Sequence, residues 1–204
     1  MKEPGQVYID PKTGEITVIP NEADGGKNVF FPVEVTYEDG STDNVTAELD
    51  VDPSVAQNLE PEYKDNIVVP GTPAETDPTF KDIDGKETTP PPGTEFSIPE
   101  DFKEPKGYTA KVDPETGKVT VNVDKDALDG DSAEEIEVPV KVKYPDGSTD
   151  DATAKFELDT DGDGDPDSTD DDDDNDGIPD QEEKDKGSNP KNGDEIPATP
   201  LEPS

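Results

Sequence analysis

The sequence contains no histidine, cysteine, tryptophan or arginine, so all seventeen of its positive charges are lysines. Without histidine and cysteine, the chain lacks the commonest general base, the thiol nucleophile and the usual ligands of zinc. Disulfide bonds are excluded for the same reason. The acidic side chains either follow a metal-binding spacing or are scattered over polar faces, so the composition argues against an enzyme.

Apolar residues are also scarce. They make up 26% of the 204 residues, and an excess of acids gives a net charge of −38. This composition is close to that of disordered chains, so we expect a small core and a domain of about 100 residues. The sign of the charge excludes nucleic acid and anionic membrane surfaces as partners.

Long hydrophobic runs are missing too. No stretch reaches the roughly 18 apolar residues of a membrane-spanning helix, and the first residues do not contain the apolar centre of a signal peptide. The C-terminus shows no sorting motif with a hydrophobic tail. We therefore expect no direct insertion into a membrane, and we interpret the chain as a fragment of a longer exported protein.

The sequence contains two copies of one acidic loop, at residues 159–170 and 172–183. Both copies have acids at loop positions 1, 3, 5, 9 and 12, glycine at position 6 and proline at position 8. Calcium takes about six to eight oxygen ligands, and a tight loop can supply them from alternate side chains, the carbonyl of position 7 and the acid of position 12. The spacing therefore predicts about two bound calcium ions.

The expected ligands follow from these positions. For the first ion they are Asp159, Asp161, Asp163, Asp165 and Asp170. For the second ion they are Asp172, Asp174, Asp176, the backbone carbonyl of Ile178, and Glu183. The acids at position 9, Asp167 and Asp180, act either directly or through water.

The alternative for this segment is a disordered acidic linker, because it holds twelve Asp and two Glu. The matched glycines and prolines favour calcium. Strand-like alternation before the loops, and a polar stretch at residues 184–190 that cannot form an amphipathic helix, argue against a helix-flanked EF-hand. The loops resemble the aspartate-rich repeats of the thrombospondin type 3 family, which implies folding around the ions without helices and an extracellular location.

A longer internal repeat precedes the loops. Residues 32–47 recur as residues 139–154 with 11 of 16 positions identical, and residues 10–18 recur as residues 113–121. Each block predicts a β-hairpin, because apolar and polar residues alternate on both sides of a glycine-containing turn. In the second copy the alternating apolar residues are Ile136, Val138, Val140, Val142 and Tyr144.

These patterns predict an all-β fold. Short strands with Pro, Gly and Asp turns are typical of an immunoglobulin-like antiparallel β-sandwich, here in repeats followed by an irregular calcium-binding acidic segment. Pro32 and Pro139 fall on outward faces, which indicates an edge or a bulge. The first copy begins near the middle of the module, so it lacks the counterpart of about residues 60–107.

The turn at residues 144–149 (YPDGST), the strand before it (VPVKVK) and the upstream DPETG block resemble the Rib and long-Rib repeats of Gram-positive surface proteins. That resemblance implies tandem immunoglobulin-like modules in the stalk of an adhesin. It also implies an extracellular location on a bacterial cell surface, with attachment to the cell wall through a parent protein.

We expect the chain to have four parts. Residues 1–56 are the truncated C-terminal half of a Rib-like repeat, residues 57–158 a complete repeat, residues 159–183 the paired loops and residues 184–204 a proline-rich linker. In the linker the spacing of Pro197, Pro200 and Pro203 is consistent with polyproline II structure.

The expected function is that of a stalk or spacer rigidified by calcium, with neighbouring repeats of the parent chain as partners. The alternative is an adhesive module whose repeat contacts a host protein, a glycan or a cell-wall polymer. Tyr37 and Tyr144 could serve as contacts in that case, although both continue an apolar strand face. A third class is an accessory segment of a secreted hydrolase whose catalytic domain lies elsewhere in the parent protein.

Overall fold

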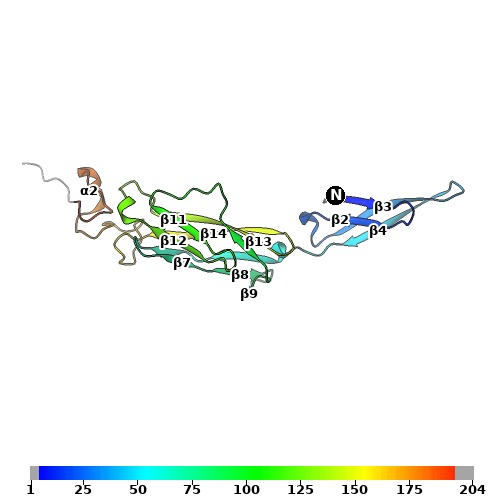
Figure 1. Ribbon diagram of the computed structural model, residues 1–204, viewed down its shortest axis with the longest axis horizontal. Helices are drawn as coiled ribbons and strands as arrows, with labels where there is room; N and C mark the ends of the chain where they lie inside the picture. Colours follow the sequence, from blue (N-terminus) through cyan, green and yellow to red (C-terminus); the bar gives the residue numbers. More distant parts are fainter. Residues whose placement is uncertain (1–4, 196–204) are drawn as a thin grey trace, which may run out of the picture.

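The computed structural model describes residues 5–195 and shows three parts arranged in a line (Figure 1). A pair of β-hairpins lies at one end, a β-sandwich in the middle, and the acidic segment at the other end. The three prolines that indicate polyproline II structure, Pro197, Pro200 and Pro203, lie outside the described residues. Within residues 5–195, no helix combines the length and the apolar character needed to cross a membrane.

The first part, which we call the half repeat, comprises residues 5–51. It contains the antiparallel hairpins β1–β2 and β3–β4, joined through a 3-10 turn, η1. Their bounds are β1 (Gln6–Ile9), β2 (Ile16–Ile19), η1 (Glu22–Asp24), β3 (Asn28–Thr36) and β4 (Thr42–Asp50). Both hairpins predicted from the internal repeat are therefore present.

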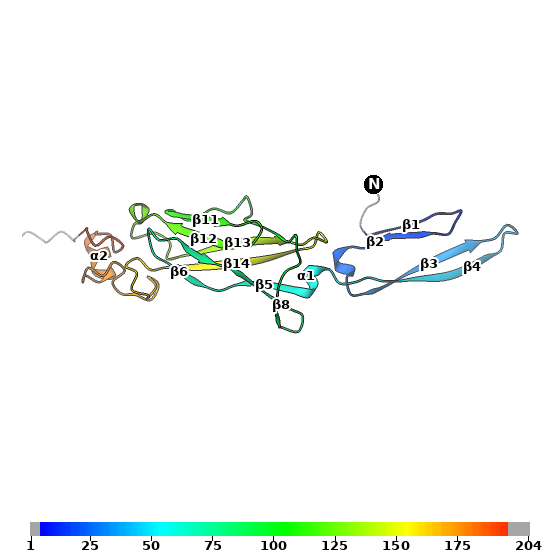
Figure 2. The same ribbon diagram turned by 60° about the horizontal axis from the view of Figure 1, so that its bottom comes forward.

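The second part, the complete repeat, begins with α1 (Val55–Asn58) and contains ten strands and a 3-10 turn, η2 (Lys125–Ala127). The strands are β5 (Leu59–Tyr63), β6 (Asn66–Val68), β7 (Ala74–Thr76), β8 (Pro78–Asp82), β9 (Glu87–Thr88), β10 (Glu95–Ser97), β11 (Tyr108–Val112), β12 (Val119–Val123), β13 (Glu135–Lys143) and β14 (Thr149–Leu158). They form a four-stranded sheet of order β10-β13-β14-β6 and two three-stranded sheets, of order β11-β12-β7 and β5-β8-β9. Figure 2 shows β13 and β14 beside β11 and β12.

The core lies between the sheets of the complete repeat. The alternating residues of β13 and the turn after it are at most 2% exposed, and Phe156 and Leu158 of β14 are fully buried. They pack with Val119 and Val121 of β12 in the opposing sheet. The predicted period of two and the predicted all-β sandwich are confirmed.

Two details of the sheets extend this prediction. The end of β14 pairs in parallel with β6, so the predominantly antiparallel sandwich contains one parallel contact. Pro139 lies inside β13, but β10 pairs only with Lys141–Lys143 of that strand. The missing amide of Pro139 therefore falls where β13 has β14 as its only neighbour, which is in effect an edge.

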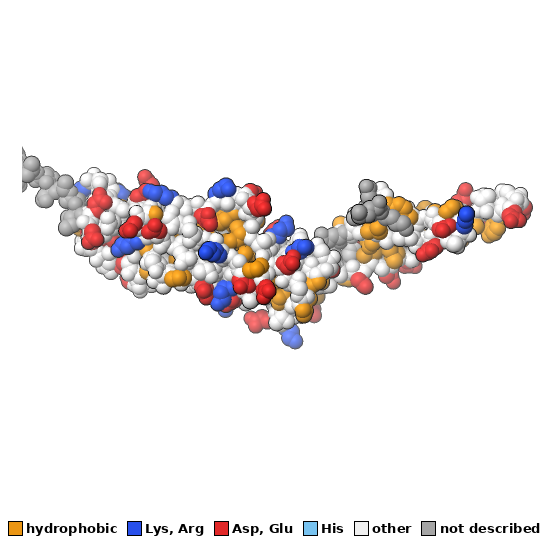
Figure 3. All heavy atoms as spheres, in the orientation of Figure 1, with side chains coloured by type: hydrophobic (Ala, Val, Ile, Leu, Met, Phe, Trp, Pro, Cys, Tyr) orange, Lys and Arg blue, Asp and Glu red, His pale blue; other side chains and the backbone are white. Residues whose placement is uncertain are grey.

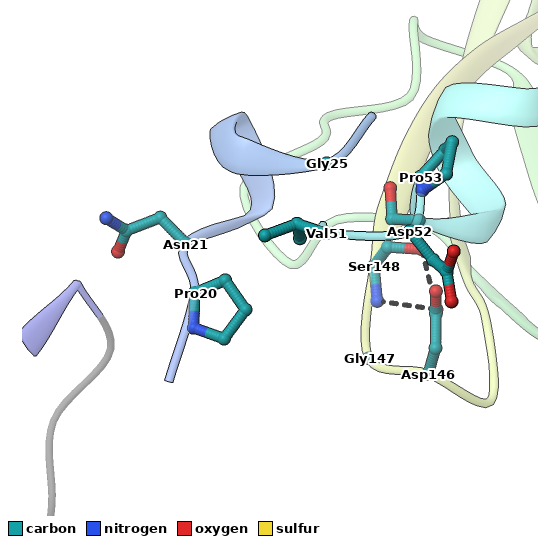
Figure 4. Close-up of a pocket in the computed structure, with 10 residues that line it drawn as sticks. Pro20, Asn21, Gly25, Val51, Asp52, Pro53, Asp146, Gly147 and Ser148 are labelled. Carbon is teal, nitrogen blue, oxygen red and sulfur yellow. Dashed lines mark hydrogen bonds between the residues drawn. The ribbon is translucent and has the colours of Figure 1, made fainter. Parts of the chain in front are cut away.

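The turn between β13 and β14 lies beside the junction between the half repeat and the complete repeat (Figure 4). Asp146 accepts a hydrogen bond from the Val55 amide at 2.8 Å, and Ser148 Oγ accepts one from the Ala56 amide at 3.1 Å. These amides belong to the first turn of α1, where helix donors lack backbone partners. The repeated Asp-Gly-Ser turn thus fixes the segment that enters the complete repeat.

We predict that the half repeat exchanges its amide hydrogens faster than the complete repeat. Val45 of β4 is 50% exposed, whereas the equivalent Ala152 of β14 is 8% exposed. Local opening should therefore cost less in the half repeat. Hydrogen exchange followed by mass spectrometry should show fast amides in residues 29–51 and slow amides in residues 136–158. Equal protection of the two segments would contradict this account.

Candidate metal centre

The first acidic loop continues directly from the sandwich. Leu158 ends β14, and the next residue, Asp159, is 2% exposed and donates its amide to the Val68 carbonyl at 3.1 Å. Further along the loop, Asp167 donates its amide back to the Leu158 carbonyl at 2.8 Å. The loop is thus an extension of the β14 and β6 sheet edge, with no free linker between them.

The two loops have the same internal hydrogen bonds. The position 6 amide donates to the position 1 carboxylate at 3.0 Å in both, from Gly164 to Asp159 and from Gly177 to Asp172. The amides of positions 5 and 7 donate in the same way to the carboxylates of positions 3 and 5. The sequence repeat is therefore also a repeat of backbone conformation.

The backbone turns sharply at positions 4 and 6 of each loop. The φ angle at position 4 is 81° for Gly162 and 56° for Asn175, and at position 6 it is 100° for Gly164 and 91° for Gly177. Glycine adopts such angles without steric cost, and asparagine tolerates the left-handed region better than most residues. These turns direct the alternate acids of each loop to one side.

Two clusters of three carboxylates result. Asp159, Asp161 and Asp163 each place an oxygen within 4.8 Å of the others, and Asp172, Asp174 and Asp176 form the matching cluster. Burial raises the pKa of Asp159 and of Asp174, because a buried carboxylate loses hydration. The clusters could hold a metal ion, which would compensate this loss.

Glu183, at position 12 of the second loop, completes the case for a cation. Its side chain is fully buried, Oε1 accepts a hydrogen bond from Ser188 at 3.1 Å, and Oε2 has no partner. Burial raises the pKa of Glu183, and Asp174 and Asp176 beside it add to the rise. Asp172 Oδ1 and Asp174 Oδ2 are likewise buried without a partner. Unpaired buried oxygens on several carboxylates fit a hard cation such as calcium.

The remaining predicted ligands, Asp165, Asp170 and Ile178, lie outside the two clusters of three carboxylates. Asp170, at position 12 of the first loop, accepts the Asp172 amide at 3.0 Å, and Asp165 accepts the Thr169 hydroxyl at 2.8 Å. The half-buried Ile178 donates its amide to Asp176 at 2.7 Å. Among the described residues, the position 12 acid is fully buried in the second loop and half-buried in the first.

The acids at position 9 lie outside both clusters and close the loops. Asp167 accepts the Thr160 amide at 2.7 Å, and Asp180 accepts the Asp173 amide at 2.9 Å, which is the same contact from position 2 in each loop. Asp167 also accepts the Thr160 hydroxyl at 2.8 Å. In this structure both residues therefore brace the loop backbone.

A buried lysine joins the two loops. Lys191 is 2% exposed, and its Nζ donates to Asp167 Oδ2 at 2.5 Å and to Asp173 Oδ2 at 2.7 Å. Burial disfavours the ammonium ion, but the two hydrogen bonds outweigh that effect and raise the pKa of Lys191. Burial raises the pKa of Asp173 to about 7, and the ammonium opposes part of that rise. No local sequence pattern indicates this contact, because the partners of Lys191 lie 24 and 18 residues away.

The segment that contains Lys191 also contacts the complete repeat. Asn189 Nδ2 donates to the Leu128 carbonyl at 3.3 Å. Pro190 lies so close to Gly130 that a Cβ added there would be 3.1 Å from the proline Cδ. Part of the stretch predicted as a linker is therefore docked on the loop after η2.

The prediction that no helix follows the loops is wrong, because α2 (Asp180–Lys186) begins inside the second loop. Its stability comes from charge: Lys184 pairs with Asp180 and Lys186 with Glu182, each at i,i+4 spacing. Gly187 ends the helix in the left-handed conformation. The residue that this helix buries is Glu183, so an apolar periodicity could not reveal it.

We predict that Lys191→Met releases the acidic segment from the complete repeat. The change leaves Asp167 and Asp173 buried without a counter-charge, which costs about 3–5 kcal/mol. Hydrogen exchange should become faster in residues 159–195 and stay unchanged in residues 136–158. The matched control Lys186→Met removes an ion pair whose side chains are 43% and 51% exposed, and should cost about 0–1 kcal/mol. Equal effects of the two variants would contradict a role for Lys191 in docking.

Comparison with known proteins finds one curated relative and several solved structures of low similarity. The lacto-N-biosidase of Bifidobacterium longum subsp. longum is 35% identical over 151 residues, which are 73% of this chain and 9% of that protein. The chain therefore spans a small part of this relative. Among solved structures, domains 4 and 5 of the S-layer protein SbsC match with a TM-score of 0.30 and 18% identity, over 74% of this chain and 64% of that one.

The sialic acid-binding region of a Streptococcus sanguinis adhesin matches with a TM-score of 0.31 and 19% identity, over 64% of this chain and 36% of that one. The family model of the Long Rib domain matches residues 1–52 and residues 56–159. These two stretches contain both copies of the internal repeat. The chain therefore belongs to the Long Rib domain family.

Proposed function

We propose that this chain is a stalk or spacer segment of a bacterial cell-surface protein, and that calcium bound in the paired loops fixes the direction in which the chain leaves the complete repeat. Membership of the Long Rib family and the linear arrangement of the parts support a spacer. The observation that carries the calcium part is the buried Glu183, whose Oε2 has no partner beside the cluster of the second loop.

The chain's own carboxylates would hold the ions. In the first loop these are Asp159, Asp161 and Asp163, and in the second loop Asp172, Asp174, Asp176 and Glu183. The other predicted ligands are the carbonyl of Ile178, Asp165 and Asp170, with Asp167 and Asp180 bracing each loop. When bound, calcium supplies two positive charges and accepts oxygen ligands, so it relieves the repulsion within each cluster.

The two sites should differ in affinity. The second loop offers a fully buried carboxylate at position 12, whereas Asp170 at position 12 of the first loop is only half-buried. Calcium affinity rises with the number of charged ligands. A site with a dissociation constant of about 10⁻⁴ M would gain about 1.4 kcal/mol of stability at about 1 mM calcium.

We predict that titration calorimetry of calcium into the chain finds about two ions, with the tighter site in the second loop. Asp176→Ala should abolish the tighter site and Asp163→Ala the weaker one, because each removes a carboxylate from a cluster. The control is Asp171→Ala, an exposed acid in the same run that belongs to neither cluster.

Loss of a site in the Asp171→Ala control would show that general negative charge binds the ions. No uptake at several millimolar calcium would leave the segment as an acidic structural element without a metal. The unfolding transition of the complete repeat serves as a check that each variant is folded.

The structure gives less support to an adhesive repeat. A position beside a catalytic domain is compatible with the spacer function. An adhesive repeat would need accessible contacts, but Tyr144 is 1% exposed and its hydroxyl donates to Asp150 at 2.8 Å, which leaves Tyr37 at 50% exposure. A spacer beside a catalytic domain is favoured by the similarity to part of a lacto-N-biosidase. Saturable binding of a glycan or wall polymer to the chain would support the adhesive function, whereas the spacer function predicts none.

A further inference from the structure

The two hairpins of the half repeat have the same strand pairing as the corresponding hairpins of the complete repeat. Ile9 pairs with Ile16 as Val112 pairs with Val119, and the register of the whole β1–β2 hairpin matches that of β11–β12. In the same way the register of β3–β4 matches that of β13–β14 throughout. The two copies therefore differ in what covers them and not in their own hairpins.

In the complete repeat, residues 54–107 supply the strands that pair with the outer edges of these hairpins. Strand β10 pairs with β13, β6 with β14, and β7 with β12. Within residues 5–195, the equivalent strands of the half repeat, β3, β4 and β2, each pair only with their hairpin partner. Three strand edges are therefore open at positions where the other copy has a neighbour.

Apolar side chains of the half repeat are exposed at the same places. Tyr37 is 50% exposed and its counterpart Tyr144 is 1% exposed. Val45 is 50% exposed and its counterpart Ala152 is 8% exposed. Figure 3 shows apolar side chains on the surface of this part of the molecule. An exposed apolar surface on a small folded part is typical of a binding site.

A hollow of about 480 Å³ lies between the two hairpins and is lined by Gly14, Ile16, Val33, Val35 and Val45, among others. A Cβ added to Gly14 would meet nothing within 4 Å. At the equivalent Gly117, a Cβ would lie 2.6 Å from the ring of Phe96. That ring packs edge-on against Phe80, with centroids 6.3 Å apart. The hollow thus corresponds to the seat of an aromatic side chain in the complete repeat.

The turn between β3 and β4 of the half repeat has the same internal hydrogen bonds as the turn between β13 and β14. Asp39 accepts the amide of Ser41 at 3.0 Å and its hydroxyl at 2.6 Å, which repeats the contacts of Asp146 with Ser148. In the complete repeat this turn additionally receives the first amides of α1. The Asp39 turn therefore offers the same acceptors to the start of another such helix.

We propose that the half repeat is an acceptor surface for the first half of another Long Rib repeat, a segment equivalent to residues 54–107. Its helix would dock at the Asp39 turn, its strands would pair with the open edges of β2, β3 and β4, and its counterpart of Phe96 would fill the hollow at Gly14. This occupant is favoured over a second copy of the half repeat because it satisfies the edges, the hollow and the turn together.

The test fuses a second copy of residues 54–102 ahead of Met1 of the full chain. The join follows the sequence, because residues 103–105 (KEP) recur as residues 2–4. Hydrogen exchange in residues 29–51 should slow by about tenfold or more relative to the parent chain. Exchange in residues 136–158 should stay unchanged, and light scattering should find a monomer.

The matched control places Gly14→Asn in the parent chain and in the fusion. Asparagine tolerates the φ of 72° at this position, but its side chain enters the hollow. The variant should leave the parent chain unchanged and abolish most of the protection gained in the fusion. Unchanged exchange in the fusion, or equal protection with Gly14→Asn, would overturn the proposal. Concentration-dependent dimers of the parent chain that protect residues 29–51 would also overturn it and assign the surface to a second copy.

Discussion

Repulsion among buried carboxylates is the constraint on which the C-terminal part of this structure depends. Fourteen acids lie between residues 159 and 183, and four of them are at most 5% exposed: Asp159, Asp167, Asp173 and Glu183. A buried charge is costly unless a partner compensates it. Lys191 compensates Asp167 and Asp173 and thereby ties the loops together. Asp159 accepts the amides of Gly162 and Gly164, and Glu183 Oε2 is buried without a partner. In our proposal, the lysine fixes the loops to each other and calcium sets the shape of each.

Hydrogen bonds of aspartate residues fix the chain at both ends of the complete repeat. At the entrance, Asp146 holds the first amide of α1. At the exit, the backbone amide of Asp159 donates to the Val68 carbonyl of β6, and that of Asp167 donates to the Leu158 carbonyl of β14. At the exit no linker separates β14 from the first loop, and the parts of the molecule lie in a line (Figure 1). This arrangement suits a protein that has to keep a distance between two points.

The features that could be predicted from the sequence are those that depend on residues close together in the chain. The alternation through β13 gave the sandwich core, and the matched offsets of Gly164 and Gly177 indicated two equivalent loops. Helix α2 was missed because ion pairs of Lys184 and Lys186 stabilise it and an acid occupies its buried face. Lys191 was missed because its partners lie 18 and 24 residues away in a polar stretch with no periodicity. The parallel pairing of β6 depends on tertiary packing and has no local signal.

The central claim, that bound ions hold the acidic segment rigidly on the complete repeat, is tested most directly by paramagnetic nuclear magnetic resonance. A lanthanide such as thulium, which takes the oxygen ligands of calcium, would be added to the full chain. The account predicts large pseudocontact shifts in β13 and β14 that fit fixed metal positions in the two loops. Small shifts that fit no single position would contradict it, because they would mean that the loops move freely relative to the sandwich.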